Sequence, residues 1–114
     1  MAATEQDLST LLEWALGRLN RPPSVRDLAR QARKSERSLT RHFQEQLGTS
    51  PGQWLLNQRI DAARQLLELT DLPVAEVATR VGFSSALNLR RRFQTRVGTT
   101  PSAYRRVFSR SQSS

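Results

Sequence analysis

Apolar side chains recur every three to four residues along the chain, the spacing that places them on one face of an α-helix. In the N-terminal part this stripe consists of Leu8, Leu11, Leu12, Ala15, Leu16 and Leu19. Thr4 and Asp7 are placed as a capping box that starts the helix, and Arg21-Pro22-Pro23 ends it. Because no segment alternates convincingly between apolar and polar residues, we expect no strands. The pattern predicts an all-α protein of about seven helices.

The helical pattern contains an internal repeat with an offset of about fifty residues. Val25, Leu28, Ala29, Ala32 and Ser35 recur as Val74, Val77, Ala78, Val81 and Ser84. After a one-residue insertion, Leu39, Phe43, Leu47, Gly48, Thr49, Pro51 and Trp54 recur as Leu89, Phe93, Val97, Gly98, Thr99, Pro101 and Tyr104. The string Phe-Gln-x-x-x-Gly-Thr-Ser/Thr-Pro stands at 43–51 and again at 93–101. Two solvated helices would not share such a string by accident.

Each copy of the repeat has the layout of a helix-turn-helix. A short helix, begun in the first copy by the capping box of Ser24 and Asp27, ends in a tight turn at Arg33-Lys34 or Gly82-Phe83. Ser35, and Ser84 or Ser85, are candidates to cap the longer helix that follows, and Gly48 or Gly98 ends it. The longer helices are expected to bury Leu39, Phe43 and Leu47, and Leu89, Phe93 and Val97. The repeat therefore predicts two helix-turn-helix subdomains, at about 25–47 and 74–97.

A single long helix is predicted to join these subdomains. Ser50-Pro51 supplies an N-cap and a proline at the first position of this helix. Thr100-Pro101 does the same for a final short helix, whose core candidates are Tyr104, Val107 and Phe108. The apolar stripes suited to packing on both lobes are Leu56, Ile60, Ala63 and Leu67, and Leu55, Ala62, Leu66 and Leu69. A helix over 51–69 spans ~28 Å, near but short of the ~34 Å between successive major-groove faces of B-DNA. We expect a first lobe at 1–50, the connecting helix at 51–69, a second lobe at 70–108 and a disordered tail at 109–114.

Charge and residue usage narrow the functional classes. The chain carries 18 Lys and Arg against 10 Asp and Glu, and seven arginines with no acidic residue lie between Ser84 and Arg110. Such charge fits nucleic acid or an anionic membrane, and it fits simple solvation or the base composition of the coding DNA equally well. The lack of cysteine excludes disulfides and thiolate zinc sites, and the one histidine, His42, has no partner at ligand spacing. With no membrane-length apolar run and no signal-peptide pattern, we expect a bacterial cytoplasmic, nucleoid-associated protein without cofactor, metal or catalytic site.

The two units together resemble the C-terminal DNA-binding domain of the AraC/XylS family of bacterial transcription activators. In the first unit the resemblance rests on the segment 35–43, Ser-Glu-Arg-Ser-Leu-Thr-Arg-His-Phe. In the second it rests on 75–78, 82–85, 91–93 and 98–105, and it covers roughly residues 8 to 108. The family often has a Gly-aromatic pair where this chain has Arg33-Lys34. The resemblance implies binding to double-stranded DNA, contacts with RNA polymerase, and an effector-sensing or dimerisation domain that would precede this module.

Helical geometry assigns the residues that face DNA, and the family resemblance implies the same faces. The residues expected to read bases are Arg37, Thr40, Arg41, Leu87, Asn88 and Arg91. The residues expected to contact phosphates are Ser35, Ser38, Ser85, Arg90 and Arg92, with Arg59, Arg105 and Arg106 as weaker candidates. Arginine can donate two hydrogen bonds to guanine O6 and N7. Leu87 either packs on the methyl group of a thymine or is an ordinary surface leucine. Asn88 is expected either to read adenine or to cap the helix locally. Arg59 is expected mainly to be solvated. His42 is expected either to have a structural role or to contact a phosphate.

The leading functional hypothesis is sequence-specific binding of an asymmetric duplex site by a transcription regulator, most simply an activator. Each copy of the repeat carries a different set of base-facing residues, so one chain needs no palindrome. The alternative is a nonspecific or architectural DNA-binding protein, which would bind every duplex with the same salt dependence. An enzyme and a membrane-surface protein are disfavoured, because no acid pair lies in a plausible cleft and the arginines lie on capped helices rather than beside an apolar face.

Overall fold

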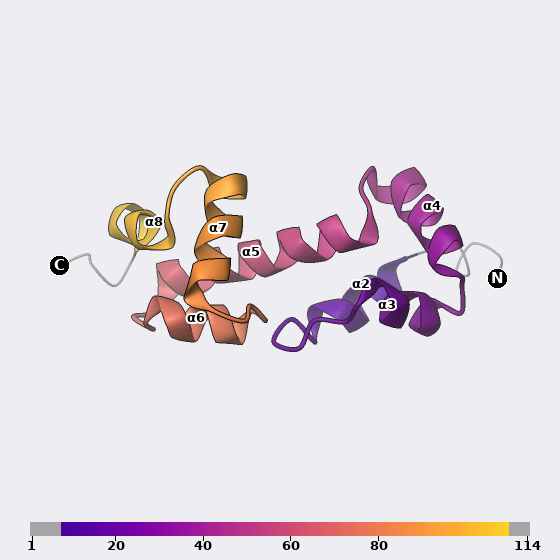
Figure 1. The fold of residues 1–114 in the computed structure, drawn as a ribbon, viewed down its shortest axis with the longest axis horizontal. Coiled ribbons are helices and arrows are strands. Elements are labelled where there is room, and N and C mark those ends of the chain that lie inside the picture. The colour runs from indigo at the N-terminus through magenta and orange to yellow at the C-terminus, as the bar shows by residue number, and fades with distance from the viewer. Residues whose placement is uncertain (1–7, 110–114) are drawn as a thin grey trace. The chain divides into compact units, whose positions relative to one another are not determined.

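The computed structural model describes residues 8–109, and these residues form seven helices and no strand (Figure 1). The helices are α2 (Ser9–Leu16), α3 (Val25–Ala32), α4 (Glu36–Leu47), α5 (Pro51–Leu69), α6 (Val74–Arg80), α7 (Ala86–Val97) and α8 (Pro101–Phe108). The predicted all-α class, with two helix-turn-helix pairs and one long helix between them, is confirmed. The expected capping box of Thr4 and Asp7, and the tail from residue 110 on, lie outside the described residues. None of the described helices is long and apolar enough to cross a membrane.

The chain divides into two compact units, one ending at Leu56 and the other beginning at Asn57. The division falls inside α5, which is one continuous helix of 19 residues. The first turns of α5 therefore belong to the unit that holds α3 and α4, and its remaining turns belong to the unit that holds α6, α7 and α8. Each unit has its own apolar core, as the repeat requires.

The core of the first unit forms around Leu28, Leu39 and Phe43, which are fully buried. Leu28 comes from α3 and the other two from α4, so the core fixes the angle between the helices of the helix-turn-helix. Trp54 of α5 meets Phe43 edge to face, with ring centroids 6.1 Å apart. The buried residues that complete this cluster are Leu8, Leu11, Ala15, Ala29 and Leu55.

The second unit repeats this arrangement with different residues. Val77 of α6 and Leu89 and Phe93 of α7 are fully buried. Tyr104 of α8 meets Phe93 edge to face at 5.5 Å between centroids, as Trp54 meets Phe43 in the first unit. The matching of Trp54 with Tyr104 in the sequence repeat thus corresponds to the same packing role. Such aromatic pairs favour edge-to-face geometry and add to the free energy of burial.

Side-chain caps define where the recognition helices begin and end. Ser35 Oγ accepts a hydrogen bond from the Ser38 amide at 3.0 Å, and Ser85 Oγ accepts one from the Asn88 amide at 3.1 Å. Ser85 rather than Ser84 is therefore the N-cap of α7. Both helices end at a glycine with positive φ, 70° at Gly48 and 88° at Gly98. The capping signals in the sequence located these helix ends within one residue.

Several positions expected in the core are exposed instead. Leu47 is 40% exposed, because eight residues of α-helix rotate it about 80° away from Leu39 and off the buried face. Val107 is 72% exposed, and Phe108 is also exposed although its ring lies 4.7 Å from that of the buried Tyr104. Leu16 and Leu69 lie at helix C-termini and are exposed too. Apolar periodicity therefore overestimated burial at the last turn of each of these helices.

Candidate nucleic-acid interface

The polar face of α4 presents two arginines to solvent. Arg37 and Arg41 are exposed and, with the half-buried Thr40, line an open depression of about 620 Å³. Among the described residues neither guanidinium has a hydrogen-bond or ion-pair partner within the protein. This face lies opposite the buried Leu39 and Phe43, as helical spacing predicted. The structure thus brings together three of the expected base-reading residues and leaves their donors available.

The exposed face of α7 combines an apolar residue with three consecutive arginines. Leu87 is 52% exposed, and Arg90, Arg91 and Arg92 are exposed. Within the described part of the chain these three guanidiniums have no hydrogen-bond or ion-pair partner. Leu87 lies about one helical turn before Arg91, so both side chains lie on the same face of the helix. The second unit therefore offers a surface that differs from the first in carrying a bulky apolar group.

Asn88 lies at the edge of the α7 surface and has a local partner. It is half-buried, and its Nδ2 donates a hydrogen bond to Ser84 Oγ at 3.3 Å. Of the two roles open from the sequence, local capping is the one that this contact supports. Reading a base would require the amide to exchange that long hydrogen bond for one to the base edge.

The serines at the helix N-termini keep a donor for an outside acceptor. The Oγ atoms of Ser35 and Ser85 each accept a backbone N–H within the protein, which leaves their hydroxyl protons unassigned. Each hydroxyl stands where the positive end of the helix dipole favours an anion. Ser38 is half-buried on the flank of α4, beside Arg41.

Other arginines that the sequence could not distinguish hold the fold together. Arg59 Nε and Nη2 donate to the carbonyls of Val81 and Gly82 at 3.0 and 2.6 Å, and its guanidinium lies 4.0 Å from the centroid of the Phe83 ring. Burial lowers the pKa of Arg59, with the nearby charge of Arg92 acting in the same direction. These contacts show that the expectation of a solvated Arg59 is wrong. The sequence could not reveal them, because a contact between residues 22 positions apart leaves no local pattern.

Arg105 has a comparable role near the end of α5. Its Nε and Nη1 donate to the carbonyls of Leu67 and Leu72 at 3.2 and 2.6 Å, which ties α8 to the last turns of α5 and to the segment between α5 and α6. This contact occupies two of its donors, so Arg105 is a poor phosphate ligand. Arg106, by contrast, is exposed.

No group of three or more His, Asp or Glu side chains suited to a metal ion occurs among the described residues. Several acidic side chains instead serve as caps or form ion pairs. Hydrogen bonds from Ser24, first its backbone N–H and then its hydroxyl, lower the pKa of Asp27. Asp61 lies 3.8 Å from Arg64 and 3.9 Å from Arg96, within the second unit. Arg96 belongs to α7, but none of these carboxylates pairs with Arg90, Arg91 or Arg92.

Comparison with known proteins supplies independent evidence of the family and the fold. A family described as a helix-turn-helix domain matches residues 28–107. The HTH-type transcriptional regulator Rv1931c of Mycobacterium tuberculosis is 39% identical over 93 residues, covering 82% of this chain and 36% of that protein. This chain therefore spans about a third of that relative.

Two solved structures share the fold over nearly the whole chain. One is the DNA-binding domain of AdpA, a global transcriptional factor, in complex with a target DNA. It has a TM-score of 0.87 and 40% identity, covering 93% of this chain and 97% of that one. The other is an AraC-type regulator from Chromobacterium violaceum, with a TM-score of 0.86, 27% identity, and coverage of 96% and 98%.

Proposed function

Because this chain belongs to the AraC/XylS family of helix-turn-helix transcription regulators, we propose that it binds double-stranded DNA in a sequence-specific manner, with α4 and α7 as its two recognition helices. Each helix enters a separate segment of the major groove, which admits an α-helix and exposes a distinct pattern of donors and acceptors for every base pair. The binding site is asymmetric, because α4 and α7 carry different side chains.

One observation carries this proposal. The exposed faces of α4 and α7 hold arginines without a partner among the described residues, whereas the arginines that border the cores are engaged. Arg59, Arg64 and Arg105 all donate hydrogen bonds within the second unit. Exposed arginines also occur on other elements, at Arg21, Arg30, Arg33 and Arg106. Two lie together on α4 and three together on α7, however, and this grouping on the recognition helices is what a DNA-binding surface requires.

The two recognition helices read different chemistry. In α4, Arg37 and Arg41 donate to guanine O6 and N7, and Thr40 contacts a neighbouring base. In α7, Arg91 reads guanine and Leu87 packs on a thymine methyl, with Asn88 at the edge. Each good bidentate contact discriminates against a wrong base by about 1–3 kcal/mol. The phosphate contacts that position the helices without specifying sequence come from Ser35, Ser38, Ser85, Arg90 and Arg92.

Selection of bound duplexes from a random pool tests this function directly. The expected result is one asymmetric consensus with two conserved segments, and a selected duplex that binds at least about a thousandfold more tightly than a scrambled one at the same salt. Equal affinity for both duplexes would instead identify a nonspecific or architectural DNA-binding protein. A perfectly palindromic consensus would contradict the proposal. It would mean that the two halves of the site are read by the same side chains, whereas α4 and α7 carry different ones.

The regulatory role extends this proposal to partners outside the chain. We infer a transcription activator that contacts RNA polymerase and acts with an effector-sensing or dimerisation domain, as the family resemblance implies. The bacterial cytoplasm, with the nucleoid, is the compartment that holds such a DNA ligand. The chain has no enzymatic role in this scheme, since recognition of DNA needs no bond to be made or broken.

A further inference from the structure

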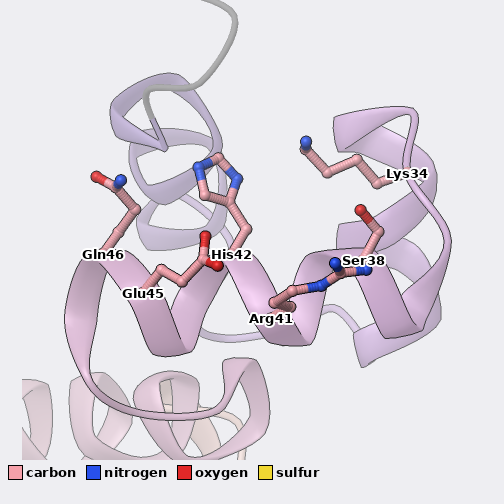
Figure 2. A pocket seen from close by; sticks show the side chains of 6 residues that line it. All are labelled: Lys34, Ser38, Arg41, His42, Glu45 and Gln46. Atoms are coloured by element: carbon pink, nitrogen blue, oxygen red, sulfur yellow. The ribbon is translucent and has the colours of Figure 1, made fainter.

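The depression between the turn that precedes α4 and the flank of that helix has no assigned role. It measures about 310 Å³ and is lined by Lys34, Ser38, Arg41, His42, Glu45 and Gln46 (Figure 2). We propose that it is a phosphodiester-binding site whose strength depends on pH, in which Lys34 and His42 hold one phosphate of the DNA backbone. The inference rests on the proposed function, and it adds to the recognition surface a site at its flank.

The placement of the side chains supports a tetrahedral anion at this position. In Figure 2 the side chains of Lys34 and His42 extend toward the same opening, with Ser38 and Arg41 below them. Arg41 also lines the depression on the base-reading face, so the two depressions adjoin along α4. An α-helix in the major groove has a phosphate backbone on each side. A cationic site on its flank is therefore within reach of that backbone.

His42 has an unusual environment for a structural residue. Its Nδ1 is buried and has no hydrogen-bond partner within the described chain. Buried polar atoms are nearly always satisfied, and each exception needs a reason. Packing within the described chain therefore does not account for an imidazole at this position.

The sequence repeat supplies a second, independent argument. His42 directly precedes the buried Phe43, as Arg92 directly precedes the buried Phe93. The two positions are therefore equivalent, and in both units a side chain that can be cationic stands beside the core phenylalanine. In the second unit that cation is permanent. In the first unit the equivalent side chain is an imidazole, a type of group that can exist in a neutral or a cationic form at physiological pH.

Three charged residues line the depression together with His42. Lys34 from the turn and Arg41 from α4 are cationic, and Glu45 from the next turn of α4 is anionic. A second depression beside His42 is lined from α2 and α3 by residues that do not titrate, namely Leu8, Thr10, Leu11, Gln31 and Ala32. A bound phosphate would add negative charge beside the imidazole and favour its protonated form. Phosphate binding and protonation of His42 therefore strengthen each other.

The test measures the affinity of the whole chain for selected and scrambled duplexes at about pH 6 and about pH 8, at one salt concentration. We expect binding of both duplexes to be about three- to tenfold tighter at the lower pH, because a phosphate contact acts on any sequence. His42→Gln is expected to abolish that pH difference, and His42→Arg to bind tightly at both pH values. Because the chain has one histidine, the residual pH dependence of His42→Gln measures every other group.

Matched variants separate the site from a change in folding. Glu45→Gln should tighten binding at both pH values, and Lys34→Gln should weaken it at both, without removing the pH difference. Unchanged helical circular dichroism for each variant shows that the unit still folds. If His42→Gln retained the pH difference of the wild type, the phosphate site at His42 would be wrong. That result differs from failure of the proposed function, which would show as equal binding of the selected and scrambled duplexes.

Discussion

Arg33 and Gly82 occupy the same position in the two helix-turn-helix units, and both have left-handed backbone conformations, with φ of 59° and 86°. The hydrogen bonds around them match as well. The amides that follow, Lys34 and Phe83, donate to the carbonyls of Ala29 and Ala78, each at 2.9 Å. The two turns are therefore the same turn. The departure from the family's usual glycine changes the residue at this position without changing the path of the backbone.

This equivalence predicts that Arg33→Gly stabilises the protein. Arg33 is the one described residue other than glycine with positive φ. A left-handed residue with a Cβ costs about 1–2 kcal/mol, and the greater freedom of glycine in the unfolded chain offsets about half of that. The expected gain is about 0.5–1 kcal/mol in the free energy of unfolding, measured with urea. The mirror variant Gly82→Ala should lose about 1 kcal/mol, and a loss in both variants would contradict the argument.

Neighbouring arginines of α7 should differ in their effect on DNA recognition. Arg91→Ala is expected to relax the preference at one base pair by about 1–3 kcal/mol, because a bidentate contact to guanine is lost. Arg92→Ala should weaken selected and scrambled duplexes alike and reduce the salt slope by about one. Selection with each variant, followed by affinity measurements across salt concentrations, separates the two outcomes. An unchanged consensus for Arg91→Ala would remove Arg91 from the base-reading residues.

The same reasoning applies to Arg41 in the first unit. Arg41→Ala is expected to change the consensus at a position in the other half of the site from the one that Arg91→Ala affects. Arg80 provides a control, since it is exposed and forms an ion pair with Glu76 at 3.2 Å within α6. Arg80→Ala should leave the consensus unchanged. If Arg41→Ala and Arg91→Ala altered the same base pair, the two helices would not read separate segments.

Arg59 should matter for stability rather than for recognition. Arg59→Met keeps the aliphatic stem but removes the hydrogen bonds to Val81 and Gly82 and the contact with Phe83. Two carbonyls lose their partner, so we expect a loss of about 1–3 kcal/mol in the free energy of unfolding. Arg80→Met, at an exposed pair, should change it by less than about 0.5 kcal/mol. A loss of DNA affinity in Arg59→Met with unchanged stability would reverse this assignment.

Tyr104 gives the second unit a sensitivity to alkaline pH. Burial, followed by the hydrogen bond that its hydroxyl donates to Glu68, raises the pKa of Tyr104 above the usual value for tyrosine, although Arg64 acts in the opposite direction. A pKa raised by folding stabilises the protein below the pKa of the unfolded chain, and this stability is lost as pH rises through the folded value. Unfolding measured from pH 8 to 11 should show that loss in the wild type. Tyr104→Phe should be less stable at pH 8 and lack the Tyr104 component of the decline.

The sequence determined much of the fold because its signals are local. Capping serines, glycines after the last helical residue and the repeated string around Phe43 and Phe93 each act within a few residues. Together they locate the helices and their order without knowledge of the tertiary structure. The exposed faces of α4 and α7 follow from the same periodicity, since the side opposite a buried phenylalanine must face outward.

Contacts between distant residues were decided only by the tertiary structure. Nothing near Arg59 distinguishes it in sequence from Arg91, yet one clamps a turn 22 residues away and the other has no partner in the described chain. Leu47 and Val107 likewise fit the apolar pattern, but no element within residues 8–109 covers them. Periodicity gives the direction of a side chain from its own helix. What that side chain meets depends on which other elements pack there, and this is the physical reason that arginine roles and burial at helix ends required the structure.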